Sequence, residues 1–399
     1  VYAETKDETG LVGKSIRLEG GPGNYLSVDS PIEFAGNHTV QAMVCPESEG
    51  SILRLGDRNE LEYRGGKYIY TAGGCQVSVE RDAQANGVFE QITATQEADT
   101  LRLYINGVLK AETTGASCDS VKAKVLMGRG MKGNLDEVRL WEKTLSSAQV
   151  ERDFNRYLHG GEDGMLAYWR FNDGIDGEFY DLAHDSNDMY YMHDGVFVRD
   201  TQTDVIYDTK IPEKGQLAYK GVTDADGSYV ISGLPYSGTE TLYTLTPVLG
   251  THNFTTGTQG AATAQCMISS DQRTHEVNFS DKSFFRVSGF VYYSGGTVPS
   301  PGVMFKIDNE VQLDSEGNFV TTDTEGRFSL SVPVGIHKVQ AFLANHTFEL
   351  DGRICNSDGS NRNYQDSIQN IHLYDNTRVR FIGRVAGGVV QEAYPLGHS

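Results

Sequence analysis

The sequence predicts an all-β protein, and three observations on composition and patterning support this. Tyrosine and phenylalanine, which favour strands, number 21 and 17 among the 399 residues. Glycine is abundant at 45 residues and proline modest at 10, a balance typical of many tight turns rather than of disorder. Long stretches of helical periodicity are nearly absent. A chain of this length is expected to divide into about two to four domains, each with its own core.

The first predicted domain has its strands between residues 13 and 172. The run "KSIRLEG" places Ile16 and Leu18 on one face of a strand, and "GGPGNYLSV" adds a glycine-rich turn and a second strand. In "TLRLYINGVLKAE" the pair Asn106-Gly107 is a strong hairpin signal. The runs "KVLMGRG" and "NLDEVRLW" indicate two further strands.

One helix is predicted, directly after these strands. Ser146 followed by Gln149 fits a capping box, and Gly160 and Gly161 are expected to end the helix. Its apolar face has three residues at helical spacing: Val150, Phe154 and Tyr157. Strand character resumes in "MLAYWRF", so we expect this segment to close a β-sandwich.

The later part of the chain contains an internal repeat. "VTDADGSYVIS" (222–232) matches "TTDTEGRFSLS" (321–331), and "VNFSDKSFFRVSGFV" (277–291) matches "IHLYDNTRVRFIGRV" (371–385). Because the acidic "TDADG" run recurs, it indicates a hairpin turn rather than a calcium loop. The predicted units are therefore 196–283, 284–376 and, beginning a third repeat, 377–399.

The first domain resembles the laminin G-like and pentraxin-like group of concanavalin A-type jelly rolls. The resemblance depends on "SIRLEGGPGNYLSV", "TLRLYINGVLKAE", "KGNLDEVRLWEKTLSSAQV" and "LAYWRF". It implies a jelly-roll sandwich over residues 1–195, with its core in 13–172. It also implies recognition of a glycan or a surface protein through the loops.

The later units resemble carboxypeptidase regulatory-like domains, which are smaller Ig-like or transthyretin-like β-sandwiches. The segments "VSGFVYYSGGTVPSPGVMFKID" and "VTTDTEGRFSLSVPVGIHKVQA" carry this resemblance. The combination resembles large multidomain surface proteins of Bacteroidetes. It implies a bacterial protein outside the cell or on its outer surface, with the chain as part of something larger.

The charge and hydropathy of the sequence limit the kinds of partner that the chain is expected to bind. The formal net charge is −20 and the sequence pI about 4.9, which argues against nucleic acid and anionic membranes as partners. No signal peptide and no apolar run of membrane length is visible. We therefore expect a monomer that does not insert into a membrane and whose partner is a glycan or a surface protein.

Carboxylates in "NLDEVRLWE" are the first candidates for catalysis, because concanavalin-type folds include glycoside hydrolases. The resemblance to those enzymes would require Glu-x-Asp-x-x-Glu, whereas here Asp136 and Glu137 are adjacent and Glu142 follows five residues later. Adjacent strand residues point to opposite faces, so the pair cannot flank one scissile bond. We expect no catalytic residues and no enzyme.

A structural calcium ion is the one cofactor that the resemblance suggests. In related jelly rolls the aspartate at the position of Asp136 holds calcium, helped by oxygens near the first glycine turn. Glu19, Gly20 and Asn24 occupy that turn here. Carboxylate and carbonyl oxygens are the ligands that calcium prefers. The alternative is an aspartate that hydrogen-bonds its own turn.

The aromatic residues and the cysteines are the remaining candidates for ligand contacts, core positions or covalent links. The patch "MYYMHDG" makes Tyr190 and Tyr191 the predicted ligand contacts, although consecutive strand residues face opposite ways and one of them can be packed. Trp141 and Trp169 are predicted core residues. The five cysteines are scattered, which favours neither a zinc site nor a disulfide framework, and a single bridge between Cys45 and Cys75 stays open.

Three functions remain open at this stage. The first is adhesion to a glycan or surface protein by a non-catalytic jelly roll with β-sandwich spacers. The second is an accessory role beside a polysaccharide-degrading enzyme. The third is a purely structural surface stalk.

Overall fold

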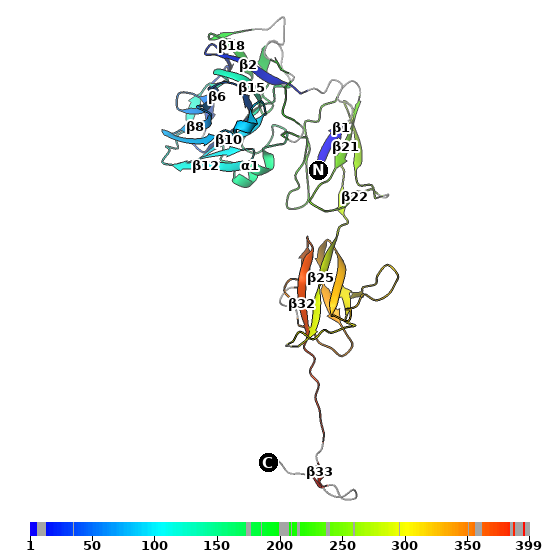
Figure 1. The fold of residues 1–399 in the computed structure, drawn as a ribbon. Coiled ribbons are helices and arrows are strands. Elements are labelled where there is room, and N and C mark those ends of the chain that lie inside the picture. Colours follow the sequence, from blue (N-terminus) through cyan, green and yellow to red (C-terminus); the bar gives the residue numbers. More distant parts are fainter. Residues whose placement is uncertain are drawn as a thin grey trace. The chain divides into compact units, whose positions relative to one another are not determined.

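The chain, seen in a computed structural model, is nearly all-β and divides into two compact units (Figure 1). Unit 1 comprises residues 1–248 and 263–277, and unit 2 comprises residues 249–262 and 278–399. The structure describes residues 1–5, 13–34, 36–172, 177–184, 186–198, 207–208, 210–213, 216–236, 240–257, 260–294, 296–349, 351–355, 361–383, 386–387 and 394–395. Within these ranges the helical elements are α1 (Ser147–Asp153) and a 3-10 turn (Ala83–Ala85), and neither could span a membrane.

Two antiparallel sheets in unit 1 form the jelly roll. The first sheet has the order β12 (Val108–Thr114), β11 (Thr100–Ile105), β10 (Glu90–Glu97), β5 (His38–Pro46), β15 (Gly130–Trp141), β2 (Ser15–Gly21) and β20 (Tyr207–Asp208), and β16 (Met165–Trp169) also pairs with β15. The second sheet has the order β17 (Glu178–Phe179), β18 (Met189–His193), β3 (Asn24–Val28), β14 (Val125–Met127), β6 (Gly50–Leu55), β7 (Asn59–Arg64), β8 (Lys67–Ala72) and β9 (Cys75–Glu80), and β19 (Val196–Phe197) pairs with β18. A short pair joins β13 (Val121–Ala123) to β4 (Ile32–Phe34).

The hydrophobic core lies between these two sheets. Alternate residues of each strand point inward, so Val40 and Leu135 of the first sheet meet Leu26 and Leu61 of the second in one buried cluster. This arrangement confirms the all-β sandwich that the alternation predicted.

The Asn106-Gly107 hairpin is confirmed. β11 and β12 pair across these two residues, whose φ angles of 49° and 79° are those of a type I′ turn. Gly107 also lies where a β-carbon would meet the ring of Phe154 at 2.6 Å. The close approach makes glycine the residue that fits here.

Helix α1 has the predicted capping box but ends earlier than its apolar periodicity suggests. The hydroxyl of Ser146 accepts from the Gln149 N–H, and the Gln149 side chain accepts from the Ser146 N–H. Arg139 donates to the carbonyl of Asp153 at 3.0 Å and to that of Arg156 at 2.7 Å. Because this buried guanidinium binds carbonyl groups at the end of the helix, the helix ends there and not at Gly160 and Gly161.

The helix and its flanking segment cover the outer face of the first sheet. A second buried cluster fills this interface: Tyr104, Trp141, Leu145, Val150, Leu158, Met165 and Tyr168. Trp169 lies in the main core instead. Both tryptophans are therefore core residues, as predicted, and the segment from 133 to 172 closes the sandwich.

A smaller sheet in unit 1 contains the N-terminal strand. Its order is β1 (Tyr2–Thr5), β21 (Glu240–Thr246) and β23 (Ala264–Ser269). The N-terminal ammonium group of Val1 donates to the Gly221 carbonyl at 2.8 Å. Thus residues 2–5, which we grouped with the jelly roll, pair with a strand more than 230 residues away, while the four-part division of the chain stays a prediction.

Unit 2 contains a β-sandwich with its own core. Two sheets of unit 2 have three strands each, in the orders β28 (Arg327–Pro333), β25 (Phe284–Tyr293), β32 (Ile368–Asp375) and β27 (Glu310–Val311), β26 (Met304–Ile307), β30 (Val339–Phe342). The two-stranded pairs of the unit are β22 (Phe254–Thr256) with β24 (Phe279–Asp281), β29 (Gly335–His337) with β31 (Arg362–Tyr364), and β33 (Ala386–Gly387) with β34 (Tyr394–Pro395). β25 and β32 pair in parallel. Side chains such as Val287, Phe305 and Leu330 fill its core.

The repeated acidic run forms the same turn in both copies. The Asp224 N–H donates to Ser228 and the Gly227 N–H donates back to Asp224; Asp323, Gly326 and Arg327 repeat the pattern. The prediction of a turn is therefore confirmed. All five cysteines lie in the described residues, and none of them forms a disulfide, Cys45 and Cys75 included.

Candidate functional site

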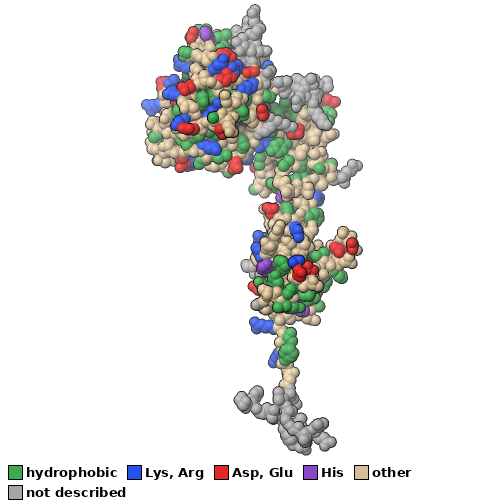
Figure 2. Space-filling view, in the orientation of Figure 1, with side chains coloured by type: hydrophobic (Ala, Val, Ile, Leu, Met, Phe, Trp, Pro, Cys, Tyr) green, Lys and Arg blue, Asp and Glu red, His purple; other side chains and the backbone are tan. Residues whose placement is uncertain are grey.

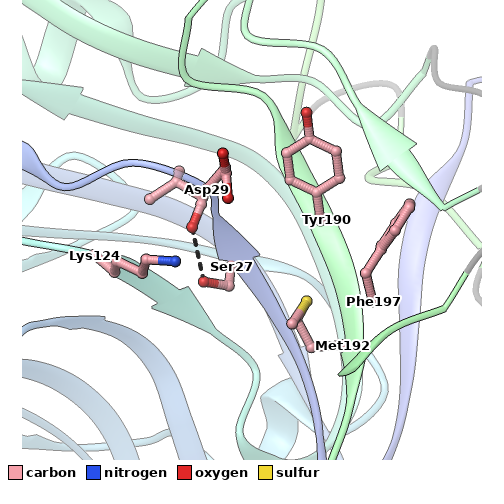
Figure 3. A pocket seen from close by; sticks show the side chains of 7 residues that line it. Ser27, Asp29, Lys124, Tyr190, Met192 and Phe197 are labelled. Carbon is pink, nitrogen blue, oxygen red and sulfur yellow. Dashed lines mark hydrogen bonds between the residues drawn. The ribbon is translucent and has the colours of Figure 1, made fainter. Parts of the chain in front are cut away.

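A pocket lies on the outer side of the second sheet, at strands β18 and β3. Tyr190 stands opposite Ser27 in this ladder, so both side chains point away from the core. The pocket has a volume of about 280 Å³ and is lined by Ser27, Val28, Asp29, Lys124, Tyr190, Met192 and Phe197. Figure 3 shows the tyrosine, methionine and phenylalanine on the β18–β19 hairpin, facing the serine, aspartate and lysine.

Two aromatic rings form one wall of the pocket. The ring of Phe197 meets that of Tyr190 edge to face, with centroids 5.2 Å apart. The Tyr190 hydroxyl donates to Glu178 at 3.1 Å. Burial, followed by this bond to a carboxylate, raises the pKa of Tyr190. The phenol is thus a neutral donor with a fixed orientation.

Tyr191 has a different role from its neighbour. It pairs opposite Leu26 and packs against the main core. Of the two predicted contacts, the structure places Tyr190 at the pocket and Tyr191 in the sandwich, as the alternation of strand residues requires.

The polar groups of the pocket carry both signs of charge. Lys124 and Asp29 are exposed at its edge, and Glu178 holds the Tyr190 hydroxyl. The Ser27 hydroxyl donates to the Val28 carbonyl at 2.9 Å and can still accept a hydrogen bond. The pocket therefore offers an apolar wall with donors and acceptors beside it, which suits an uncharged polyhydroxylated ligand.

Asp136 is buried on β15 beside Glu137. Its carboxylate accepts from the Glu137 N–H at 2.8 Å, as in the alternative of an aspartate bonded to its own turn. Burial and then the nearby Glu137 raise the pKa of Asp136 well above its usual range. Glu137 has a φ of 49° at an irregularity of the ladder, which explains why two consecutive carboxylates are both buried.

Buried cations surround Glu137. Its carboxylate accepts from Arg139 at 3.0 Å and from the Tyr168 hydroxyl, and Arg170 lies 3.7 Å away. The rings of Tyr157 and Tyr219 stack at 4.2 Å, and the Arg170 guanidinium lies over the first. The charged groups of this cluster therefore stabilise the packing of the jelly roll against residues near 219 within unit 1.

The other predicted calcium ligands lie at the turn between β2 and β3. Asn24 donates to the Gly20 carbonyl at 3.1 Å, and Glu19 forms ion pairs with Arg17 and Lys132 at 3.1 Å. Glu19 stands opposite Lys132 in the ladder, four residues from Asp136, a separation of roughly 13 Å along the strand. The structure therefore does not bring Asp136 together with this turn.

No cluster suited to a metal ion occurs in the part of the chain that the structure describes. Specifically, no three His, Cys, Asp or Glu side chains come together there in a way that could hold one. The four residues do not fit one coordination sphere, and calcium binding stays a prediction.

Phe197 could have been found from the sequence. Asp194 and Gly195 form a two-residue turn, with φ angles of 49° and 80°, that sets Phe197 opposite Met192. The dipeptide Asp-Gly is a known hairpin signal. Lys124 and Asp29 carry no comparable signal, because they reach the pocket only through long-range strand pairing.

Comparisons with known proteins agree with the fold. Residues 23–151 match a laminin G-type family described as the concanavalin A-like lectin/glucanases superfamily. A search of curated proteins returned no match.

The solved structures that the comparison returned are distant from this chain in sequence. A Bacteroides ovatus protein described as carbohydrate-binding shares 14% identity over 47% of this chain and 61% of its own, with a TM-score of 0.39. A heptameric SAP-like pentraxin from Limulus polyphemus shares 12% over 46% and 96%, with a TM-score of 0.32. A Ruminococcus gnavus sialidase module, CBM40, seen with α2,3 sialyllactose, shares 13% over 35% and 97%, with a TM-score of 0.27.

The strand order and the family match lead to one conclusion. The chain contains a concanavalin A-like jelly-roll domain at residues 23–151, within an otherwise β-stranded protein.

Proposed function

We propose that the jelly roll is a non-catalytic glycan-binding module and that its ligand contacts Tyr190. The observation that carries the proposal is the pocket itself, where two aromatic rings stand beside hydroxyl, carboxylate and ammonium groups on the outer side of the sheet. A sugar ring has apolar C–H faces and a polar rim, so it can stack on one wall and hydrogen-bond to the other.

The size of the pocket supports a small epitope. Its volume of about 280 Å³ lies near the lower end for ligand sites, which suits one or two sugar residues rather than a long chain. Orientation would come from Lys124 and Asp29, and stacking from Tyr190 and Phe197.

The surroundings of Glu137 and Glu142 support a binding role rather than hydrolysis. Glu137 is enclosed, with its side chain 0% exposed, and is bonded to Arg139 and Tyr168. A carboxylate held in this way cannot approach a glycosidic bond. Glu142 lies exposed beyond it, so the two do not flank a common site.

The wider role is an extracellular one. In this proposal the regulatory-like sandwiches after the jelly roll act as spacers, and the chain serves in adhesion to a glycan or surface protein at the bacterial surface. A role as an accessory region of a polysaccharide-degrading enzyme uses the same pocket.

A glycan-array screen of the whole chain tests the proposal, followed by affinity measurement on the best glycan. Tyr190→Ala should weaken binding about tenfold or more, since a central aromatic contact is lost. Tyr180→Ala, at a tyrosine that is exposed outside the pocket lining, is the matched control and should bind normally. Equal binding by the Tyr190 variant would overturn the assignment of the pocket.

A further inference from the structure

The sheet of β28, β25 and β32 in unit 2 has an outer face rich in aromatic side chains. Burial alternates along β25, so Val287 and Val291 point into the core while Phe290 and Tyr292 point outward. His372 and Tyr374 of β32 stand opposite these two residues in the parallel ladder. The four rings thus form one strip across two strands, which we call the aromatic strip.

The rings of the aromatic strip are in mutual contact. Phe290 and Tyr292 lie 5.8 Å apart with their planes inclined by 9°, and His372 meets them edge-on at 5.9 and 5.8 Å. Tyr374 lies 6.3 Å from Tyr292. The strip is therefore a continuous surface that is already organised, and it would lose little side-chain entropy on binding. Figure 2 shows hydrophobic side chains with a histidine and basic groups over β25 and β32.

Charges of both signs border the aromatic strip. Arg327 places its guanidinium 6.0 Å from the centre of the Phe290 ring and pairs with Glu325. Arg286, further along β25, donates to the Ser329 hydroxyl at 3.1 Å. Phe348 forms an antiparallel bridge with Asp375, and the N–H of the next residue, Glu349, donates to the Tyr374 carbonyl. Glu349 therefore stands opposite Tyr374, and its side chain lies on the same face as the aromatic strip. Two cations and two carboxylates balance, although the whole chain carries −20.

We propose that the aromatic strip is a second glycan-binding surface, and that its ligand is a neutral polysaccharide chain. The balanced charge favours an uncharged ligand, whose hydroxyl groups can accept from arginine and donate to glutamate. Nucleic acid would need a net positive surface.

The side-chain types on this face also suit a sugar ligand. Besides the aromatic strip, the outward positions of β25 and β28 carry arginine, serine, one proline and Phe284, with no aliphatic side chain. An aromatic surface with hydroxyl and charged neighbours matches the alternating apolar and polar faces of a sugar chain.

Affinity electrophoresis of the whole chain in gels containing xylan, mannan or xyloglucan tests the proposal, with polygalacturonate as the acidic probe. At least one neutral polysaccharide should retard the protein, and raising the salt concentration should not abolish the effect. Retardation by polygalacturonate alone, or by no probe, would overturn it.

Variants then assign the binding to the aromatic strip. The double variant Phe290→Ala/Tyr292→Ala should weaken binding about tenfold or more, and His372→Ala, at an exposed ring, should weaken it while sparing the fold. Phe319→Ala, 60% exposed elsewhere in unit 2, is the matched control. Tyr190→Ala leaves this binding intact, which separates it from the jelly-roll pocket. Unchanged binding by both His372→Ala and the folded double variant would refute the proposal.

Discussion

His252 and Asp281 form a hydrogen-bonded pair, Nδ1 to Oδ2 at 2.5 Å, that recurs 94 residues later as His346 and Asp375. The neighbours recur as well: Ser283 and Thr377 donate both hydroxyl and backbone N–H to the aspartates, and Phe254 and Phe348 stack on the histidines. The repeat seen in the sequence is thus a repeat of one hydrogen-bonded arrangement.

This arrangement predicts an acid-sensitive contribution to the stability of unit 2. Burial acts to raise the pKa of Asp375, but bonds from Thr377 and His346 outweigh it and leave the pKa lowered. A carboxyl whose pKa falls on folding stabilises the fold above its unfolded value, about 3.9, and that contribution is lost as the pH drops through the folded pKa. Denaturant unfolding at a series of pH values should show this decline below about pH 4.

The variant Asp375→Asn should be less stable than the parent at neutral pH and should lose part of that acid decline. Asp366→Asn, at an exposed carboxylate of the same unit, is the control. Identical pH profiles for the parent and Asp375→Asn would show that the pair is not a source of stability.

Glu137→Gln should destabilise unit 1 strongly. The change leaves the buried guanidinium groups of Arg139 and Arg170 without their carboxylate, at a cost of about 3–5 kcal/mol. Asp136→Asn is the comparison, because it removes a carboxyl that burial disfavours in its charged form. Its free energy of unfolding at pH 7 should match or exceed that of the parent. Equal losses in the two variants would contradict the assigned roles.

Gly107→Ala should cost more stability than Gly65→Ala. Both residues have positive φ angles, 79° and 59°, so each substitution pays about 1 kcal/mol of backbone strain. Only at Gly107 would the new β-carbon meet a neighbour, the ring of Phe154; none lies within 4 Å at Gly65. Thermal unfolding of the two variants measures the difference, and equal melting temperatures would mean that the Phe154 ring moves freely.

The calcium hypothesis can be tested by thermal unfolding with calcium and then with excess chelator. The sequence-based expectation is a rise in Tm of several degrees, or roughly 1 kcal/mol of linked binding, which Asp136→Ala abolishes. Any such site would need oxygens other than those of Glu19, given the strand register. A melting temperature indifferent to calcium would end the hypothesis.

Local features of the fold could be predicted from the sequence. Asn106-Gly107 and the capping box at Ser146 are set by the conformational preferences of a few neighbouring residues. The pairing of β1 with β21 could not be predicted, because the local sequence "VYAET" carries no signal for a partner strand more than 230 residues away. The early end of α1 depends on Arg139, a residue outside the helix.

The candidate site divides in the same way. Tyr190 could be found from its aromatic and polar neighbours in the sequence, and strand alternation indicated that one of the two tyrosines would be packed. Asp29 follows β3 and Lys124 lies between β13 and β14, so the two meet Tyr190 only in the folded sheet. The predicted group around Asp136 separated because the register of β2 with β15 depends on the whole sandwich.

The pairing of β1 with β21 has a practical consequence for anyone who dissects this protein. A fragment cut at residue 195 would keep Tyr2–Thr5 but lose the strand that they pair with, and β2 would lose β20. Both losses expose strand edges, which recruit other chains and promote aggregation. Chain order and spatial neighbourhood differ here, and because the two compact units interleave between residues 249 and 277, a single cut in that stretch also separates paired strands.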